Sequence, residues 1–229
     1  AEGGSVSSHG TSSLYTLPSN EEIHGLQETS DLYMNNMFKL QLDEMLKYIH
    51  PSGGHKQAIE HLLRSLQACI MRVPKIDPQP LSKAVQELAS RVGHSVHIPL
   101  VEPVPREDPA YMIAFEPPEA LNLVGSWPLH TATRRVGEMD VDMEVVMPSK
   151  LFQEKDTLNA RYFTKRAFYL AVILAYVEQN HAALGVRAEW LYVGGDPRRS
   201  CLVLRPTPEA HDLIKTHTVV RIHAAHAPG

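Results

Sequence analysis

The sequence LNLVGS at residues 121–126 and the sequence DVDMEVVM at residues 140–147 decide the fold of this chain. Both are short runs of apolar residues, and the second is rich in valine, which is typical of β-strands. Side chains two residues apart on a strand point to the same face, so Asp140 and Asp142 are expected to lie side by side. A Gly-Ser pair follows the first run. These two segments therefore predict two strands that carry polar groups.

Apolar runs of strand length continue on both sides of these segments. Strands are predicted at 111–115, 121–124, 141–147, 186–193, 201–204 and 219–223. Residues 156–179 predict one long helix, which we expect to be fully buried because it is apolar on nearly all sides at 170–174. This order of elements favours an α+β fold, in which a mixed β-sheet packs against a long helix, over a doubly wound parallel sheet.

The N-terminal part of the chain has a helical period. Three amphipathic helices are predicted, at 31–49, at 59–70 and at 81–92, the last opened by Pro80 and capped by Gly93. Residues 1–30 are rich in small and polar groups, which predicts a flexible tail. The expected organisation is a tail, an N-terminal helical segment and an α/β domain, at 1–30, 31–100 and 101–229. The chain begins at Ala1, and we expect it to be a fragment of a larger multidomain protein.

Charge and composition restrict the partners. The 22 basic residues are outnumbered by 26 acidic ones, so any RNA contact is expected to be local and not driven by a global positive field. No apolar run approaches the roughly 20 residues that cross a bilayer, so no membrane partner is expected. The 13 histidines form no cluster with cysteines, and no metal site is predicted from them.

The polar groups around the two central strands suit metal-dependent phosphate chemistry. Asp140 and Asp142 could hold a pair of divalent ions, while the amides of Gly125 and Ser126 with the serine hydroxyl could cradle the phosphates of a nucleotide. Two metals held by carboxylates are what nucleotidyl transfer requires. The alternative is a simple turn followed by a strand with one solvated face, because short matches of this kind are common.

A basic patch is predicted on the first turns of the long helix. Arg161 and Lys165 are four residues apart and Arg166 is adjacent, so the three are candidates for binding the phosphates of RNA or of a nucleotide. The alternative is a solvated helix face paired with Glu154 and Asp156. The aromatic residues beside the patch could stack on bases, although their spacing is more typical of a core: Tyr162, Phe163, Phe168 and Tyr169.

Two levels of family resemblance follow from these residues. Gly125-Ser126 together with Asp140-x-Asp142 resembles the signature of the polymerase-β nucleotidyltransferase superfamily, which includes poly(A) polymerases and CCA-adding enzymes. A narrower resemblance is carried by three runs: FQEKDTLNARYFTKRA at 152–167, VGSWPL at 124–129 and NMFKLQLDEML at 36–46. These runs are similar to the first domain of the Nrap family of nucleolar proteins, which belong to the small-subunit processome.

The Nrap resemblance implies a role and a location. It implies a noncatalytic scaffold with a degenerate nucleotidyltransferase fold, acting in small-subunit ribosome biogenesis and pre-rRNA processing in the nucleus and nucleolus. The implied partners are ribosome assembly proteins of the processome and pre-rRNA or snoRNA. No cofactor is implied.

Catalysis by the wider superfamily needs a third carboxylate on a later strand beside the first two. The strand predicted at 201–204 has none, Glu189 is the only strand candidate, and Asp196 lies in a predicted turn. Without it, one metal is poorly held and the nucleophile lacks a base. We therefore predict that the chain is not an enzyme and that four residues are vestigial: Gly125, Ser126, Asp140 and Asp142. The alternative is an active Mg²⁺-dependent RNA nucleotidyltransferase of the poly(A)/CCA-adding type that uses Asp140 and Asp142.

Overall fold

The computed structural model describes residues 17–102, 104, 111–133, 138–158, 160–207 and 217–226. The chain divides into two compact units, Ala1–Tyr48 and Ile49–Gly229, which are considered one at a time. None of the helices in the described ranges combines the length and the hydropathy that a membrane span requires.

The first unit consists of helix α1 (Asn20–Met34) and helix α2 (Asn36–Ile49), the latter ending one residue into the second unit. Ser19 and Glu22 form a capping box at the start of α1: the Glu22 N–H donates to Ser19 Oγ at 3.2 Å, and the Ser19 N–H donates to Glu22 Oε2 at 2.7 Å. The predicted flexible tail is therefore wrong for residues 20–30, because this box satisfies N–H groups that the first helical turn leaves open. Residues 1–16 lie outside the described residues.

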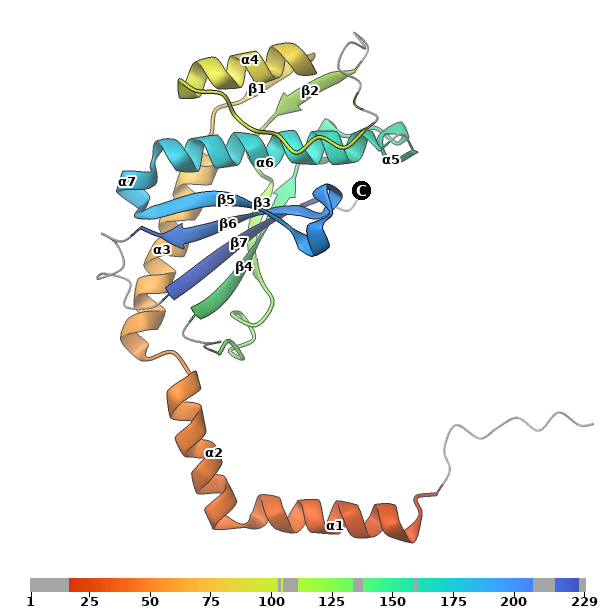
Figure 1. The fold of residues 1–229 in the computed structure, drawn as a ribbon, viewed down its shortest axis with the longest axis vertical. Coiled ribbons are helices and arrows are strands. Elements are labelled where there is room, and N and C mark those ends of the chain that lie inside the picture. The colour runs from red at the N-terminus through yellow and green to blue at the C-terminus, as the bar shows by residue number, and fades with distance from the viewer. Residues whose placement is uncertain are drawn as a thin grey trace, which may run out of the picture. The chain divides into compact units, whose positions relative to one another are not determined.

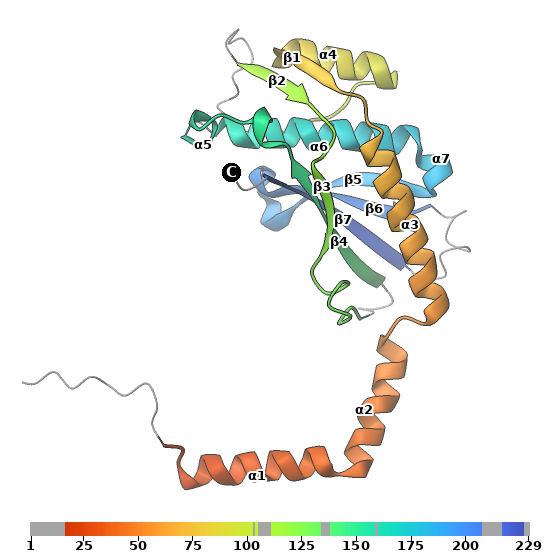
Figure 2. The same ribbon diagram turned by 180° about the vertical axis from the view of Figure 1, so that it is seen from behind.

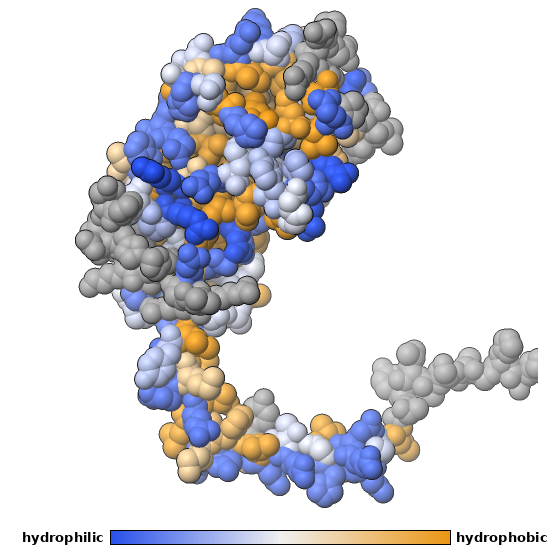
Figure 3. Space-filling view, in the orientation of Figure 1, coloured by the Kyte–Doolittle hydropathy of each residue, from blue (hydrophilic) through white to orange (hydrophobic). Residues whose placement is uncertain are grey.

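A break at Asn35 separates α1 from α2, where one continuous helix had been predicted from residue 31. Asn35 has an extended backbone, with φ −71° and ψ 116°, and its side-chain oxygen accepts a hydrogen bond from the Met37 N–H at 3.0 Å. Asparagine competes with helical hydrogen bonding in this way, which explains the interruption. Apolar side chains are exposed along both helices (Figure 3), and none of the described side chains of α2 is buried.

A five-stranded mixed sheet forms the centre of the second unit. Its strand order is β3-β4-β7-β6-β5, with β4 and β7 parallel and all other neighbours antiparallel. This arrangement confirms the predicted α+β class and the mixed sheet. The strands are β3 (Ala120–Val124), β4 (Glu138–Met147), β5 (Val186–Tyr192), β6 (Ser200–Pro206) and β7 (His217–His226).

Helices and a second small sheet pack around the central sheet. Helix α3 (Gly53–Met71) lies behind the strands in Figure 1 and in front of them in Figure 2. Helix α4 (Leu81–Val92) ends as predicted at Gly93, whose φ is 79° and whose N–H donates to the Ala89 carbonyl at 2.9 Å. The remaining elements are β1 (Ile76–Pro80), β2 (Met112–Phe115), α7 (His181–Leu184) and three short 3₁₀ helices, η1 (Ser149–Leu151), η2 (Val193–Gly195) and η3 (Pro197–Arg199).

The long helix α6 (Arg161–Gln179) is buried on two sides. It lies between the five-stranded sheet and a layer made of α4, β1 and β2 (Figure 1), which explains why it is apolar nearly all round. The predicted helix from residue 156 is interrupted: α5 (Lys155–Leu158) is separated from α6 by Ala160, whose φ of 56° lies in the left-handed region. A left-handed residue cannot continue a right-handed helix, so the chain turns there.

Strand β4 divides its side chains between two faces. Five alternate apolar residues are buried against the helices: Met139, Val141, Met143, Val145 and Met147. The intervening residues point to the opposite face, over which none of α3 to α7 lies. The period-2 pattern of the sequence thus separates an apolar core from an open polar face.

Candidate functional site

The open face of β4 carries a row of four carboxylates, Glu138, Asp140, Asp142 and Glu144, each partly or fully exposed. Alternation along the strand brings all four to one side, as was predicted for Asp140 and Asp142. Repulsion among parallel carboxylates is relieved only by positive or donor groups beside them. The neighbours of this row therefore decide what the face can do.

Gly125 and Ser126 lie next to the carboxylate pair. Val124, the last residue of β3, is in register with Asp142, so the chain turns away directly beside this aspartate. Gly125 has φ 74°, and a Cβ atom built on it would lie 3.1 Å from Asp142 Oδ2. The Ser126 carbonyl accepts a hydrogen bond from the Thr131 N–H at 3.0 Å. The structure thus places Gly125 beside the predicted aspartate pair, with Ser126 next in the chain, and the glycine is favoured by both its dihedral angle and the close approach of Asp142.

Gly125→Ala is expected to lower the free energy of unfolding by about 1–2 kcal/mol, because a Cβ is strained at positive φ and crowds Asp142. The matched control is Gly54→Ala near the start of α3, where a Cβ would meet no atom within 4 Å and φ is not positive. This control should be neutral or gain about 0.5–1 kcal/mol, since a helical alanine restricts the unfolded chain. Urea unfolding of both variants tests the difference, and equal effects would contradict it.

The strand on the other side of the carboxylates is β7, which contributes a guanidinium and an imidazole. Arg221 is in register with Asp142. Its Nη2 atom pairs with Asp140 Oδ2 and its Nη1 atom lies 3.7 Å from Asp142 Oδ1. His223 Nε2 lies 3.2 Å from the same Asp142 oxygen. A single guanidinium therefore bridges the two aspartates, with an imidazole at its side.

The two outer carboxylates of the row, Glu138 and Glu144, also have polar partners. Arg205 Nη1 lies 3.4 Å from Glu138 Oε1, and Asn122 Nδ2 donates to Glu144 Oε2 at 3.1 Å. Every carboxylate of the row thus has a partner on a neighbouring or nearby strand. Charge-assisted hydrogen bonds of this kind fix the side chains in place, although their partial exposure keeps each one modest in energy.

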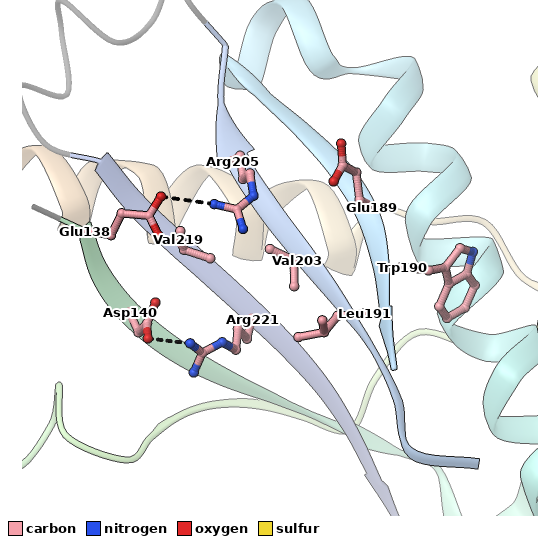
Figure 4. A pocket seen from close by; sticks show the side chains of 9 residues that line it. All are labelled: Glu138, Asp140, Glu189, Trp190, Leu191, Val203, Arg205, Val219 and Arg221. Atoms are coloured by element: carbon pink, nitrogen blue, oxygen red, sulfur yellow. Dashed lines mark hydrogen bonds and ion pairs between the residues drawn. The ribbon is translucent and has the colours of Figure 1, made fainter. Parts of the chain in front are cut away.

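The two acids considered as a third ligand lie elsewhere. Glu189 is on β5, which β7 and β6 separate from β4. Figure 4 shows Arg205 and Arg221 between Glu189 and the carboxylate row. Asp196 caps the 3₁₀ helix η3, because its carboxylate accepts from the Arg198 N–H at 2.9 Å; this hydrogen bonding to Arg198 also lowers the pKa of Asp196. Neither acid faces Asp140 and Asp142.

A hollow of about 300 Å³ opens on the same face (Figure 4). Its floor is apolar, and its rim is made of acids and arginines. The lining residues are Glu138, Asp140, Glu189, Trp190, Leu191, Val203, Arg205, Val219 and Arg221. In the space-filling view, hydrophilic and apolar groups lie side by side over the strands (Figure 3).

The residues of the predicted basic patch interact with other groups of the same chain. Lys165 Nζ pairs with Asp156 Oδ2 at 2.6 Å and donates to the Leu151 carbonyl at 2.7 Å, and the two side chains are 10% and 3% exposed. This pairing matches the predicted Asp156 contact, but the pair is buried and not solvated. It joins α6 to the segment before it.

The two arginines of the patch also contact the fold. Arg166 Nε donates to the Ala224 carbonyl at 3.0 Å, and burial lowers the pKa of this guanidinium. The Arg161 guanidinium lies over the Tyr111 ring, 5.1 Å from its centre. Arg161 and Arg166 are partly exposed, and their binding of phosphate stays a prediction.

Arg221 and His223 are the site residues that sequence reasoning missed. The search for a third carboxylate considered residues 201–204, Glu189 and Asp196, whereas the later strand that pairs with β4 is β7. His223 is one of the 13 histidines from which no site was predicted. The alternation of Arg221 and His223 with buried Val220, Ile222 and Ala224 marks them as open-face residues, but only the strand order reveals what they face.

The residues present do not fit the two metal ions that the nucleotidyltransferase resemblance implies. A divalent ion of this class needs several oxygen ligands with free lone pairs. Here both aspartates face cationic partners, and strand β7 supplies no acid. Among the described residues, no group of three or more His, Cys, Asp or Glu side chains is arranged to hold a metal.

The fold and the site define an α+β domain whose mixed sheet places Gly125-Ser126 beside the Asp140-x-Asp142 pair, with Arg221 bridging the two aspartates. The family model for Nrap protein domain 1 matches residues 78–229. The chain therefore belongs to the Nrap family, as the sequence runs had indicated.

Curated relatives support the same assignment. The chain is 35% identical to nucleolar protein 6 of Mus musculus over 84% of its own length, and 30% identical to that of Xenopus laevis over 95%. It is 27% identical to U3 small nucleolar RNA-associated protein 22 of Saccharomyces cerevisiae over 80%. The chain spans only 15–18% of the length of these relatives. Their names confirm the nuclear and nucleolar location expected from the sequence.

Proposed function

We propose that this chain is a noncatalytic scaffold domain of a nucleolar protein that serves ribosome biogenesis and pre-rRNA processing. Membership of the Nrap family and the nucleolar relatives support the setting. The observation that carries the noncatalytic role is Arg221, which lies on β7, a later strand beside β4, and pairs with Asp140 where the nucleotidyltransferase resemblance calls for a third carboxylate. The domain thus combines the Gly-Ser and Asp-x-Asp residues of that resemblance with a charge distribution that does not suit nucleotidyl transfer.

Nucleotidyl transfer requires negative groups that hold metal ions and a base that accepts the proton of the attacking hydroxyl. Arg221 contributes the opposite charge at this position and holds Asp140 and Asp142 in ion pairs. A guanidinium is always protonated in proteins and cannot act as the base. We therefore favour the scaffold over the alternative of an active RNA nucleotidyltransferase.

The partners proposed for the domain are ribosome assembly proteins and U3-type snoRNA or pre-rRNA. One relative is named for its association with U3 small nucleolar RNA, which supports an RNA-containing particle as the setting. The four carboxylates of β4 disfavour a polyanion on the open sheet face, because phosphates would meet like charges there. RNA contacts are therefore proposed for partly exposed basic groups elsewhere, with Arg161 and Arg166 as the first candidates.

Incubation with labelled nucleoside triphosphates, a U3-type RNA and either Mg²⁺ or Mn²⁺ tests this proposal. We expect no incorporation above background for the parent chain or for the double variant Asp140→Ala plus Asp142→Ala. We also expect both proteins to bind the RNA and assembly partners equally. Incorporation by the parent that disappears in the double variant would establish the enzyme alternative instead.

A further inference from the structure

We propose that Arg221 is a resident cation that takes the place of the catalytic metal ions, so that Asp140 and Asp142 bind neither Mg²⁺ nor Mn²⁺. The inference rests on the proposed function, because it concerns the same carboxylate pair, and it specifies what replaced the metals. It concerns metal affinity and not activity, so the two claims can fail separately.

The geometry of Arg221 is that of a bridge. It lies in register with Asp142 on a parallel neighbouring strand, pairs through Nη2 with Asp140 and places Nη1 3.7 Å from Asp142 Oδ1. Two carboxylates two residues apart on a strand are the groups that an ion would link. The planar guanidinium with its forked donors spans the same distance and carries a permanent positive charge.

The remaining lone pairs of Asp142 are restricted as well. Oδ1 faces both Arg221 and His223, the latter at 3.2 Å. Oδ2 faces Gly125, where a Cβ would lie only 3.1 Å away. An entering ion would have to displace these neighbours, lie next to a fixed positive charge and find its other oxygen ligands without an acid on β7.

Replacing the positive charge of Arg221 with a negative one should restore a set of three carboxylates that can bind a metal ion. Arg221→Asp removes the resident cation and puts a third carboxylate in register with Asp142, on the same face of the sheet. Arg205→Asp is the matched control, because it makes the same change in charge on the same face but lies on β6, beside Glu138 and away from Asp142. Any general electrostatic attraction of cations is common to both variants.

Titration with Mn²⁺, followed by the loss of the electron paramagnetic resonance signal of the free ion, measures the affinity. We expect no saturable site in the parent chain, and an affinity for Arg221→Asp that is at least about tenfold higher than for Arg205→Asp. Thermal unfolding of the parent should be the same in EDTA and in excess Mg²⁺, because a ligand that bound the folded state would raise the unfolding temperature.

Saturable Mn²⁺ binding by the parent that is lost in Asp140→Ala would overturn the inference, as would equal affinities of the two arginine variants. If Arg221→Asp does not fold, the neutral variant Arg221→Gln and the parent titration still decide the matter. Metal binding by the parent chain without nucleotide incorporation would contradict the resident-cation inference but leave the scaffold proposal intact. Nucleotide incorporation by the parent chain without a metal site at Asp140 and Asp142 would overturn the scaffold proposal but leave the resident-cation inference intact.

Discussion

Replacing Lys165 with methionine is expected to lower the free energy of unfolding by about 3–5 kcal/mol, because it leaves the Asp156 carboxylate buried without its countercharge. The two side chains are 10% and 3% exposed, and their Nζ–Oδ2 distance is 2.6 Å. The substitution also removes the hydrogen bond to the Leu151 carbonyl. Urea unfolding followed by circular dichroism measures the change.

Two comparisons separate the buried pair from other effects of the Lys165 substitution. Lys155→Met makes the same chemical change at an exposed lysine and should alter the stability by no more than about 0.5 kcal/mol. The double variant Lys165→Met plus Asp156→Leu should recover part of the loss, since no unpaired charge remains. Unchanged stability of Lys165→Met with a selective loss of RNA affinity would instead favour the phosphate-binding role predicted for this lysine.

Phe168→Ala is expected to destabilise the chain by about 3–5 kcal/mol through the loss of buried apolar surface and the cavity left behind. Phe168 is 0% exposed and lies on α6 within the core shared by the sheet and the helices. Its burial confirms the core role expected from its spacing. A urea unfolding curve with the same m value and a lower midpoint is the predicted signature.

Phe163→Ala is the control for this substitution, because it removes the same atoms at a partly exposed position five residues earlier on α6. It should lower the stability by only about 1 kcal/mol. If the two variants were equally destabilised, the burial of Phe168 would not be the cause. If Phe163→Ala also lowered the affinity for single-stranded RNA, base stacking at Phe163 would become the better explanation of its exposure.

Residues that open or cap a helix correctly predicted those elements whose ends depend on nearby sequence alone. Pro80 and Gly93 delimit α4 because proline opens a helix and glycine accepts the left-handed cap. Strand β1 was missed because Pro78 and Pro80 argue against a strand, yet it has a single partner, β2, in a two-stranded sheet. The start of α1 was not predicted, although Ser19 and Glu22 have the spacing of a capping box. The small and polar composition of residues 1–30 was given more weight than this cap.

The candidate site was predictable only in part for a different reason. Gly125, Asp140 and Asp142 are close because β3 and β4 are joined in one antiparallel hairpin, so their proximity follows from nearby sequence. Arg221 reaches them through the parallel pairing of β4 with β7, which is far along the chain. No local pattern specifies which strand a later segment will join, and the search for a third ligand therefore looked at the wrong strand.

The position of β7 also has a consequence for synthesis of the chain. The hairpins β3-β4 and β5-β6 are both complete before residues 217–226 leave the ribosome, but only β7 joins them. Until then, the edges of β4 and β6 that will pair with β7 have no neighbour, and α6 lacks its contacts with β7. Such intermediates expose strand edges that pair readily with other chains. This part of the nascent chain is therefore most in need of chaperone protection just before β7 emerges.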